Sequence, residues 1–145
     1  MNKFESLFAA YPCVLTDESV KAMVAEILAE HFNENNNIEV WKQCLHSIDL
    51  TTLNGEKKKK KVETMAQRVN EFEEKFPGVP NVAAMCVYPA LVQTASDTLT
   101  EPIGIAAVAA GFPASQTFIE VKVAEAAMAV AAGATEIDIV ISIGK

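Results

Sequence analysis

The stretch Gly133-Ala134-Thr135-Glu136-Ile137-Asp138-Ile139-Val140-Ile141-Ser142 decides the fold, because it places one carboxylate inside a run of β-branched residues. Apart from Asp138, residues 137–141 are isoleucine or valine, which is typical of a strand covered on both faces in a parallel sheet. Burial of a bare carboxylate is costly unless the group is paired or hydrogen-bonded. We therefore expect this strand to be buried and to have a specific use for Asp138.

The rest of the chain alternates helical segments with other short apolar segments. This alternation predicts a parallel sheet covered by helices, which is either a doubly wound open sheet or a (β/α) barrel. No GxGxxG or GxxxxGK[ST] motif follows an expected strand, so the usual sign of an open-sheet nucleotide site is missing. The expected strands lie at about 45–51, 81–88, 102–108 and 136–141, and the expected helices at about 17–32, 62–76, 90–99 and 117–132.

Three polar residues in these strands are candidates for chemistry. In a barrel, strand side chains alternate between the lumen and the helices, so Asp49, Cys86 and Asp138 would face the lumen near its C-terminal mouth. Asp138 is either a proton shuttle or one partner of a structural ion pair. Asp49 either pairs with a catalytic lysine or caps a turn. Cys86 either lines a pocket or fills space as a small buried hydrophobe.

The composition excludes several classes of function. A net charge of −7, from 12 basic and 19 acidic residues, leaves no general basic footprint for nucleic acid, and no apolar run approaches the roughly 20 residues of a membrane span. Three cysteines without CxxC spacing, and no signal peptide, predict reduced thiols in a cytoplasmic protein. The two histidines lack ligand-spaced partners, so no metal is expected. The lysine run 57–61 is interpreted as a solvated loop, with a phosphate contact as the alternative.

Four blocks of sequence together resemble deoxyribose-phosphate aldolase, a family of class I aldolases. They occur in the order and spacing of the family and cover about residues 45–145. The helix expected at 17–32 resembles the segment that precedes the barrel in longer members, so we expect an N-terminal helical extension at 1–40 and the barrel at 41–145. The blocks are Ile48-Asp49-Leu50-Thr51-Thr52-Leu53, Val82-Ala83-Ala84-Met85-Cys86-Val87-Tyr88-Pro89, Ala107-Val108-Ala109-Ala110-Gly111-Phe112-Pro113 and Gly133-Ala134-Thr135-Glu136-Ile137-Asp138-Ile139-Val140.

The resemblance implies a (β/α)8 TIM barrel and one reaction. The family reversibly cleaves 2-deoxy-D-ribose 5-phosphate to D-glyceraldehyde 3-phosphate and acetaldehyde in deoxyribonucleotide catabolism, through a lysine Schiff base and without a cofactor. It implies that Asp138 assists proton transfer at the carbinolamine and enamine stages, and that Asp49 belongs to the lysine network. The substrate pocket implied by the resemblance contains Thr51, Leu53, Cys86 and Phe112.

The sequence departs from the family where the chain stops. Strands five to eight, with the Schiff-base lysine and the phosphate site, would lie beyond Lys145, and neither Lys145 nor Lys42 matches a catalytic lysine. We therefore expect a partial barrel of about four parallel strands, without a Schiff-base lysine and inactive alone, whose sugar-phosphate partner binds in the full-length context. Its open edges predict a homo-oligomer or pairing with a separate C-terminal half. A third hypothesis is a stand-alone enzyme that uses Asp49 and Asp138 as an acid–base pair.

Overall fold

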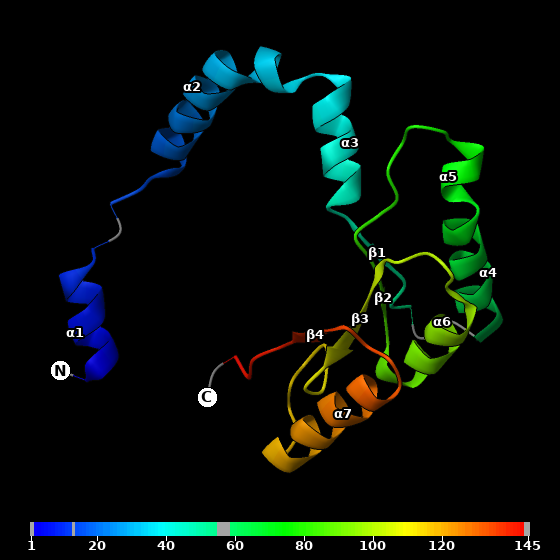
Figure 1. The fold of residues 1–145 in the computed structure, drawn as a ribbon. Coiled ribbons are helices and arrows are strands. Elements are labelled where there is room, and N and C mark those ends of the chain that lie inside the picture. Colours follow the sequence, from blue (N-terminus) through cyan, green and yellow to red (C-terminus); the bar gives the residue numbers. More distant parts are fainter. Residues whose placement is uncertain (1, 13, 55–58, 144–145) are drawn as a thin grey trace. The chain divides into compact units, whose positions relative to one another are not determined.

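The chain divides into two compact units, residues Met1–Val40 and Trp41–Lys145, and each is described by itself. The computed structural model describes residues 2–12, 14–54 and 59–143. Part of the lysine run (residues 57 and 58) and Lys145 therefore lie outside the described residues. Figure 1 shows the order of the elements along the chain.

The first unit consists of helices with well-formed N-terminal caps. Helix α1 (Lys3–Ala10) is capped by Asn2, and helix α2 (Asp17–Asn35) is capped by the Thr16 side chain. In both, the cap side chain and the third helical residue bond each other's backbone N–H groups, which satisfies donors that the helix leaves free. The prediction of a helix from residue 17 is confirmed, whereas α1 was not predicted. Among their described residues, α1 and α2 bury no side chain.

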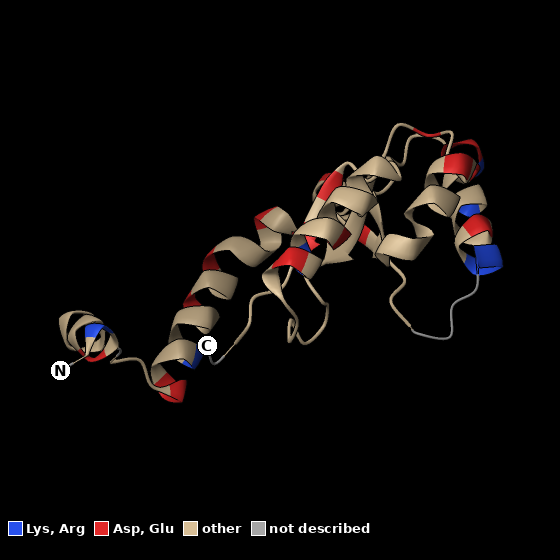
Figure 2. Cartoon of the chain, turned by 90° about the horizontal axis from the view of Figure 1, so that it is seen from below, with Lys and Arg blue, Asp and Glu red and all other residues tan. Residues whose placement is uncertain are grey.

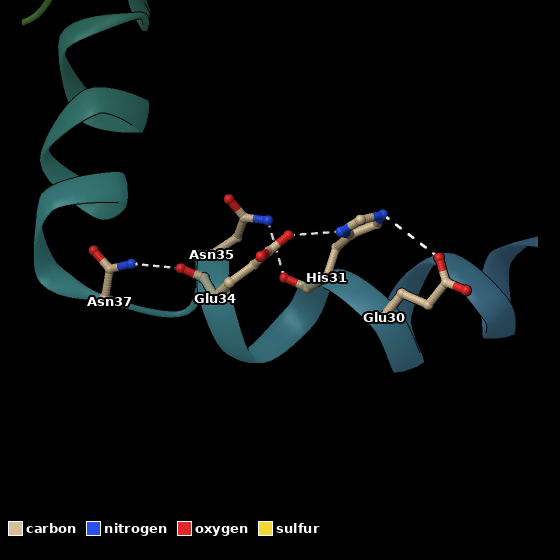
Figure 3. A network of polar contacts seen from close by, with 5 residues as sticks. All are labelled: Glu30, His31, Glu34, Asn35 and Asn37. Carbon is tan, nitrogen blue, oxygen red and sulfur yellow. Dashed lines mark hydrogen bonds and ion pairs between the residues drawn. The ribbon is translucent and has the colours of Figure 1, made fainter.

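A network of polar contacts at the end of α2 leads into the next helix (Figure 3). His31 Nδ1 lies 2.6 Å from Glu34 Oε1, and the Asn35 side chain donates to the His31 carbonyl at 2.9 Å. Asn37 donates to the Glu34 carbonyl at 2.7 Å, and its own Oδ1 accepts the backbone N–H groups of residues 39 and 40, each at 3.1 Å. Asn37 therefore begins helix α3 (Ile38–His46) as a cap.

The first strand is shorter than expected because α3 occupies its predicted beginning. Strand β1 covers Asp49–Thr51, whereas the prediction began at Leu45. Three further strands follow, β2 (Ala84–Val87), β3 (Gly104–Ala109) and β4 (Glu136–Ile139). They form one sheet in the order β1-β2-β3-β4, and every neighbouring pair is parallel. The predicted α/β fold with about four parallel strands is confirmed.

Helices connect the strands and cover one face of the sheet (Figure 1). They are α4 (Lys59–Asn70), α5 (Phe72–Lys75), the 3-10 turn η1 (Pro89–Leu91), α6 (Val92–Thr98) and α7 (Ile119–Ala131). Because strand side chains alternate between faces, every second residue of β2 and β3 reaches these helices. The core of this face consists of Met85, Val87, Ile105 and Ala107 from the strands, with Val62, Ala66, Val69, Val92, Ala95 and Ala129 from the helices.

The expectation that β4 is buried is wrong. Asp138 is exposed, and Ile139 retains 63% of its accessible surface. Within the described part of the chain, β4 pairs with β3 alone, so one side of the strand has no neighbour to cover it. The apolar run in the sequence therefore indicates an element that needs a partner, and the burial itself depends on that partner being present.

No helix in residues 2–12, 14–54 and 59–143 is both long and apolar enough to cross a bilayer.

Candidate functional site

The strand register brings the predicted site residues to one face of the sheet. Thr51 is level with Cys86 on the neighbouring strand, and Asp138 is level with Val108. Asp49, two residues before Thr51, shares its face because side chains in a strand alternate. Asp49, Thr51, Cys86 and Asp138 therefore all lie on the face that the helices do not cover.

This face has a small apolar floor with the thiol at its centre. Cys86 is 4% exposed, and it lies in a cluster with three other buried strand residues, whereas Asp49, Thr51 and Asp138 are exposed. Half-buried side chains from the strand ends pack against this floor. The buried floor residues are Ala84, Cys86, Ala106 and Val108, and the covering residues are Leu53, Tyr88 and Phe112.

The thiol of Cys86 lies within electrostatic reach of both carboxylates. Burial raises the pKa of the Cys86 thiol, and the negative charges of Asp138 and Asp49 raise it further. A hydrogen bond with the Thr51 side chain acts in the opposite direction. The pKa of Cys86 therefore depends on side chains from β1 and β4, which are on opposite sides of β2 and β3 in the sheet.

We expect Asp138→Asn to make Cys86 more reactive. A raised pKa lowers the thiolate fraction at pH 8, and the thiolate is the species that alkylates. Removing the Asp138 charge lowers the pKa of Cys86, so its alkylation rate should rise a few-fold, within the roughly tenfold range of one pKa unit. Peptide mapping by mass spectrometry after timed alkylation between pH 7 and 10 measures this rate. The control variant is Asp97→Asn in α6, and an unchanged Cys86 profile in Asp138→Asn would contradict the placement.

Tyr88 is a residue of this face that the sequence analysis did not single out. It follows β2 directly, and its ring packs edge-on against Phe112 with 6.2 Å between ring centroids and 64° between ring planes. The pair joins the end of β2 to the loop after β3. The signal was present in the sequence, because Pro89 marks the point where the strand ends and Tyr88 directly precedes it.

Glu136 is a second carboxylate of β4 on the same face. It is level with Ala106, two residues before Asp138, and it is exposed. A Cβ atom added to Gly104 would lie 2.5 Å from Glu136 Oε1 and 3.1 Å from the Ala84 Cβ atom. Glycine at position 104 therefore makes room for the Glu136 carboxylate over β3.

The loop after β3 holds Phe112 in a defined backbone conformation. Ala110 and Gly111 have positive φ angles of 64° and 75°, and the Phe112–Pro113 peptide bond is cis. The Gly111 N–H donates to Glu125 Oε2 of α7 at 2.9 Å. A Cβ atom on Gly111 would also lie 2.9 Å from the Thr117 methyl group, so both φ and space require glycine there.

The described lysines lie outside the strands of the sheet. None of the four described strands contains a lysine. Lysines 59–61 are exposed and form the start of α4, so the interpretation of these three residues as a loop is wrong. Figure 2 shows basic positions at that end of the helix. Among the described residues, no group of three or more His, Cys, Asp or Glu side chains could hold a metal ion.

Comparison with known proteins gives the family. The profile of the DeoC/LacD family aldolases matches residues 44–145, which include the whole sheet and every site residue above. The chain belongs to the DeoC/LacD aldolase family. A Caenorhabditis elegans relative described as a putative deoxyribose-phosphate aldolase is 34% identical over 129 residues, which are 87% of the chain and 42% of that protein. Human deoxyribose-phosphate aldolase is 38% identical over 112 residues, 66% of the chain and 33% of the human protein.

Solved aldolase structures share the fold over part of their length. The structure described as QR15, an aldolase, is 29% identical, with a TM-score of 0.56 over 66% of this chain and 38% of its own. The tetrameric deoxyribose-phosphate aldolase of Aeropyrum pernix, 20% identical, has a TM-score of 0.60 over 75% of this chain and 43% of its own and shows the fold alone. The chain thus spans about a third to two fifths of the curated relatives cited here.

Proposed function

We propose that the chain carries the strand-one to strand-four part of a deoxyribose-phosphate aldolase site. The reaction is the reversible cleavage of 2-deoxy-D-ribose 5-phosphate to D-glyceraldehyde 3-phosphate and acetaldehyde. The observation that supports it most is the placement of Asp49, Cys86 and Asp138 on one uncovered sheet face within the family match. Human deoxyribose-phosphate aldolase, at 38% identity, supports the choice of substrate within the family.

In this proposal, the reaction proceeds through a lysine Schiff base. The amine attacks the aldehyde of the open-chain sugar, and water leaves the carbinolamine to give an iminium ion. As the C2–C3 bond breaks, the C3 hydroxyl group loses its proton and becomes the aldehyde of D-glyceraldehyde 3-phosphate, and the iminium ion accepts the electron pair and becomes an enamine. Protonation and hydrolysis of the enamine release acetaldehyde and the free amine. The iminium ion is the electron sink, so the proposal includes no metal or cofactor. Asp138 transfers protons at the carbinolamine and enamine stages, and Asp49 orients the lysine network. The substrate would contact Thr51, Leu53, Cys86 and Phe112.

The Schiff-base lysine is proposed to come from polypeptide outside these 145 residues. Two observations support this part. The four described strands contain no lysine, and Lys122, the half-buried lysine of α7, already donates to two serine hydroxyls at 2.5 and 2.9 Å. The chain alone would then have no lyase activity. We place the assembled enzyme in the cytoplasm, in deoxyribonucleotide catabolism.

A complementation experiment tests the proposed function. The purified chain is assayed alone and after mixing with the C-terminal half of human deoxyribose-phosphate aldolase, with acetaldehyde release coupled to NADH oxidation. Borohydride is then added, and the adduct formed with 2-deoxyribose 5-phosphate is mapped by mass spectrometry. We expect lyase activity only in the mixture, with the adduct on a lysine of the added half. An adduct at one lysine of this chain would overturn the lysine assignment, and a stable but inactive mixture would contradict the aldolase site.

The open sheet edges favour a second proposal, that this half-barrel self-associates or complements a separate chain. In the described part of the chain, β1 and β4 each pair with one strand, and three isoleucines at or beyond β4 are more than 60% exposed. Exposed apolar side chains beside an unpaired strand edge favour association. The isoleucines are Ile139, Ile141 and Ile143.

We expect Ile139→Lys to reduce self-association of the isolated chain. A lysine on an edge strand disfavours strand addition, because pairing would bury its charge. The weight-average mass, measured by light scattering during size-exclusion chromatography, should shift toward 15.6 kDa in the variant. Val123→Lys, on the exposed surface of α7, is the matched control because it adds the same charge away from the edge. A monomeric wild-type chain would refute the self-association part of this second proposal.

A further inference from the structure

A polar cluster outside the proposed site joins three segments of the second unit. Lys122 Nζ, on α7, donates to Ser115 Oγ at 2.5 Å and to Ser142 Oγ at 2.9 Å. Ser115 belongs to the loop after β3, and Ser142 lies in the segment after β4. Ser115 is fully buried, and Lys122 and Ser142 are half-buried. The described contacts of the Lys122 ammonium group are therefore with neutral hydroxyl oxygens.

The hydrogen bonds of both hydroxyl groups explain why a cation is needed there. Ser115 Oγ donates its proton to the Val140 carbonyl at 3.0 Å, and Ser142 Oγ donates its proton to the Ser115 carbonyl at 2.9 Å. A hydroxyl group has one proton, so both oxygens can now act only as acceptors, and each needs a donor such as Lys122. An ammonium group carries three donors and no acceptor, and it can therefore donate a hydrogen bond to both serine oxygens at once.

The same helix also holds the other end of the loop. Glu125, three residues after Lys122 on α7, accepts the Gly111 N–H at 2.9 Å, and the Ser115 N–H donates to the Gly111 carbonyl at 2.8 Å. The loop between Gly111 and Ser115 contains Phe112, which covers the floor around Cys86. The residues bonded on the other side, Val140 and Ser142, follow Asp138 closely in the chain.

We propose that Lys122 is a positioning residue, which holds the loop of Phe112 and the segment after Asp138 in register through the hydroxyl groups of Ser115 and Ser142. This inference rests on the proposed function, which assigns Phe112 to the substrate pocket and Asp138 to proton transfer. Lys122 itself neither contacts the substrate nor forms the Schiff base. Its role is to keep Phe112 over Cys86 and Asp138 level with Val108.

The Cys86 thiol reports on this positioning without substrate or lyase activity. In Lys122→Met, the two hydroxyl oxygens lose their donor, and the segment after β4 is held only by its direct hydrogen bonds with Ser115, at 3.0 and 2.9 Å. Cys86 should then be less covered and less affected by Asp138, so its alkylation at pH 8 should rise about three- to tenfold. Lys122→Arg keeps donors for both oxygens and should restore most of the wild-type rate. Lys75→Met, an exposed lysine of α5, is the matched control.

Two further measurements separate positioning from general stability. Ser142→Ala removes one acceptor at a half-buried position, and it should also raise the rate of Cys86 alkylation. This variant tests the proposal even if Lys122→Met does not fold. Amide hydrogen exchange in wild type and variants should increase at residues 111–115 and 140–143 with little change in β2. Wild-type Cys86 alkylation in both Lys122→Met and Ser142→Ala, each folded by circular dichroism, would overturn the proposal, and failure of the aldolase assay would leave this test unaffected.

Discussion

Asp138→Asn is expected to lower the lyase turnover of the complemented enzyme about 100-fold or more, because asparagine cannot carry a proton between reaction stages. Positioned general acid–base groups contribute about 10²–10⁴-fold to a rate, and we propose that Asp138 serves two stages of this reaction. Asparagine has nearly the same shape, and Asp138 is exposed in this chain, so the fold should tolerate the change. Steady-state kinetics of the mixture with the C-terminal half measure the loss.

Glu136→Gln is the matched control for this prediction. Glu136 lies on the same strand and the same face, two residues closer to the N-terminal end of the sheet. In parallel barrels the chemistry lies at the C-terminal ends of the strands, so neutralising Glu136 should change the turnover far less. Equal losses of turnover in both variants would show that the total negative charge on this face, and not Asp138 in particular, determines the rate. Full activity of Asp138→Asn would remove this residue from the mechanism.

The second large effect is expected from Met85→Ala, which should lower the free energy of unfolding of the second unit by about 3 kcal/mol. Met85 is the central strand residue of the core under the helices and has no exposed surface. Truncating a buried methionine to alanine loses the transfer free energy of the removed atoms and leaves a cavity, at a cost of about 2–5 kcal/mol. Urea denaturation followed by far-UV circular dichroism gives the midpoint and slope for both proteins.

Met128→Ala provides the comparison for Met85→Ala. Met128 lies on α7 with 72% of its surface exposed, so the same truncation removes little buried area. Surface substitutions of this kind usually change stability by within about 0.5 kcal/mol. Similar losses in the two variants would show that Met128 is covered in solution, for example by a second copy of the chain. No loss in Met85→Ala would contradict the core described here.

All four strands were predictable from the sequence, whereas the start of β1 and the exposure of β4 were not. The apolar runs of β2 and β3 indicate strands because residues on both faces of these strands are buried, and the alternation of Met85 with Cys86 predicts which residue faces which side. The run around Asp138 is also apolar apart from its carboxylate, yet β4 is largely exposed. Composition records the environment for which a strand is suited, whereas its actual burial depends on the neighbours present.

The missed helices had local signals that other signals outweighed. Asn2 followed by Glu5 is a capping box before α1, but the segment is short and lies at the chain terminus. The asparagine-rich stretch 33–37 suggests a break, although Asn37 caps a new helix that contains Leu45. Asparagine favours both turns and helix caps, so its presence alone does not distinguish the end of one helix from the start of the next.

Part of the candidate site follows from strand periodicity, and part arises from tertiary contacts. Asp49, Cys86 and Asp138 were predictable because each interrupts an apolar strand. Lys122 gives no such signal, since a lysine in a helix is ordinarily solvated. Its partners lie 7 and 20 residues away in the sequence and meet it only after β4 has paired with β3.

The sequential order of the strands has a consequence for synthesis of the chain. Each strand pairs with the one made immediately before it, so no pairing has to wait for a segment that emerges much later from the ribosome. Pairing between strands that are neighbours in the sequence has a smaller loop-closure cost than pairing between more distant strands. At every stage two edges are unpaired, the edge of β1 and the edge of the newest strand. A nascent chain of this kind therefore needs protection at one fixed edge and at one edge that moves with the last strand completed.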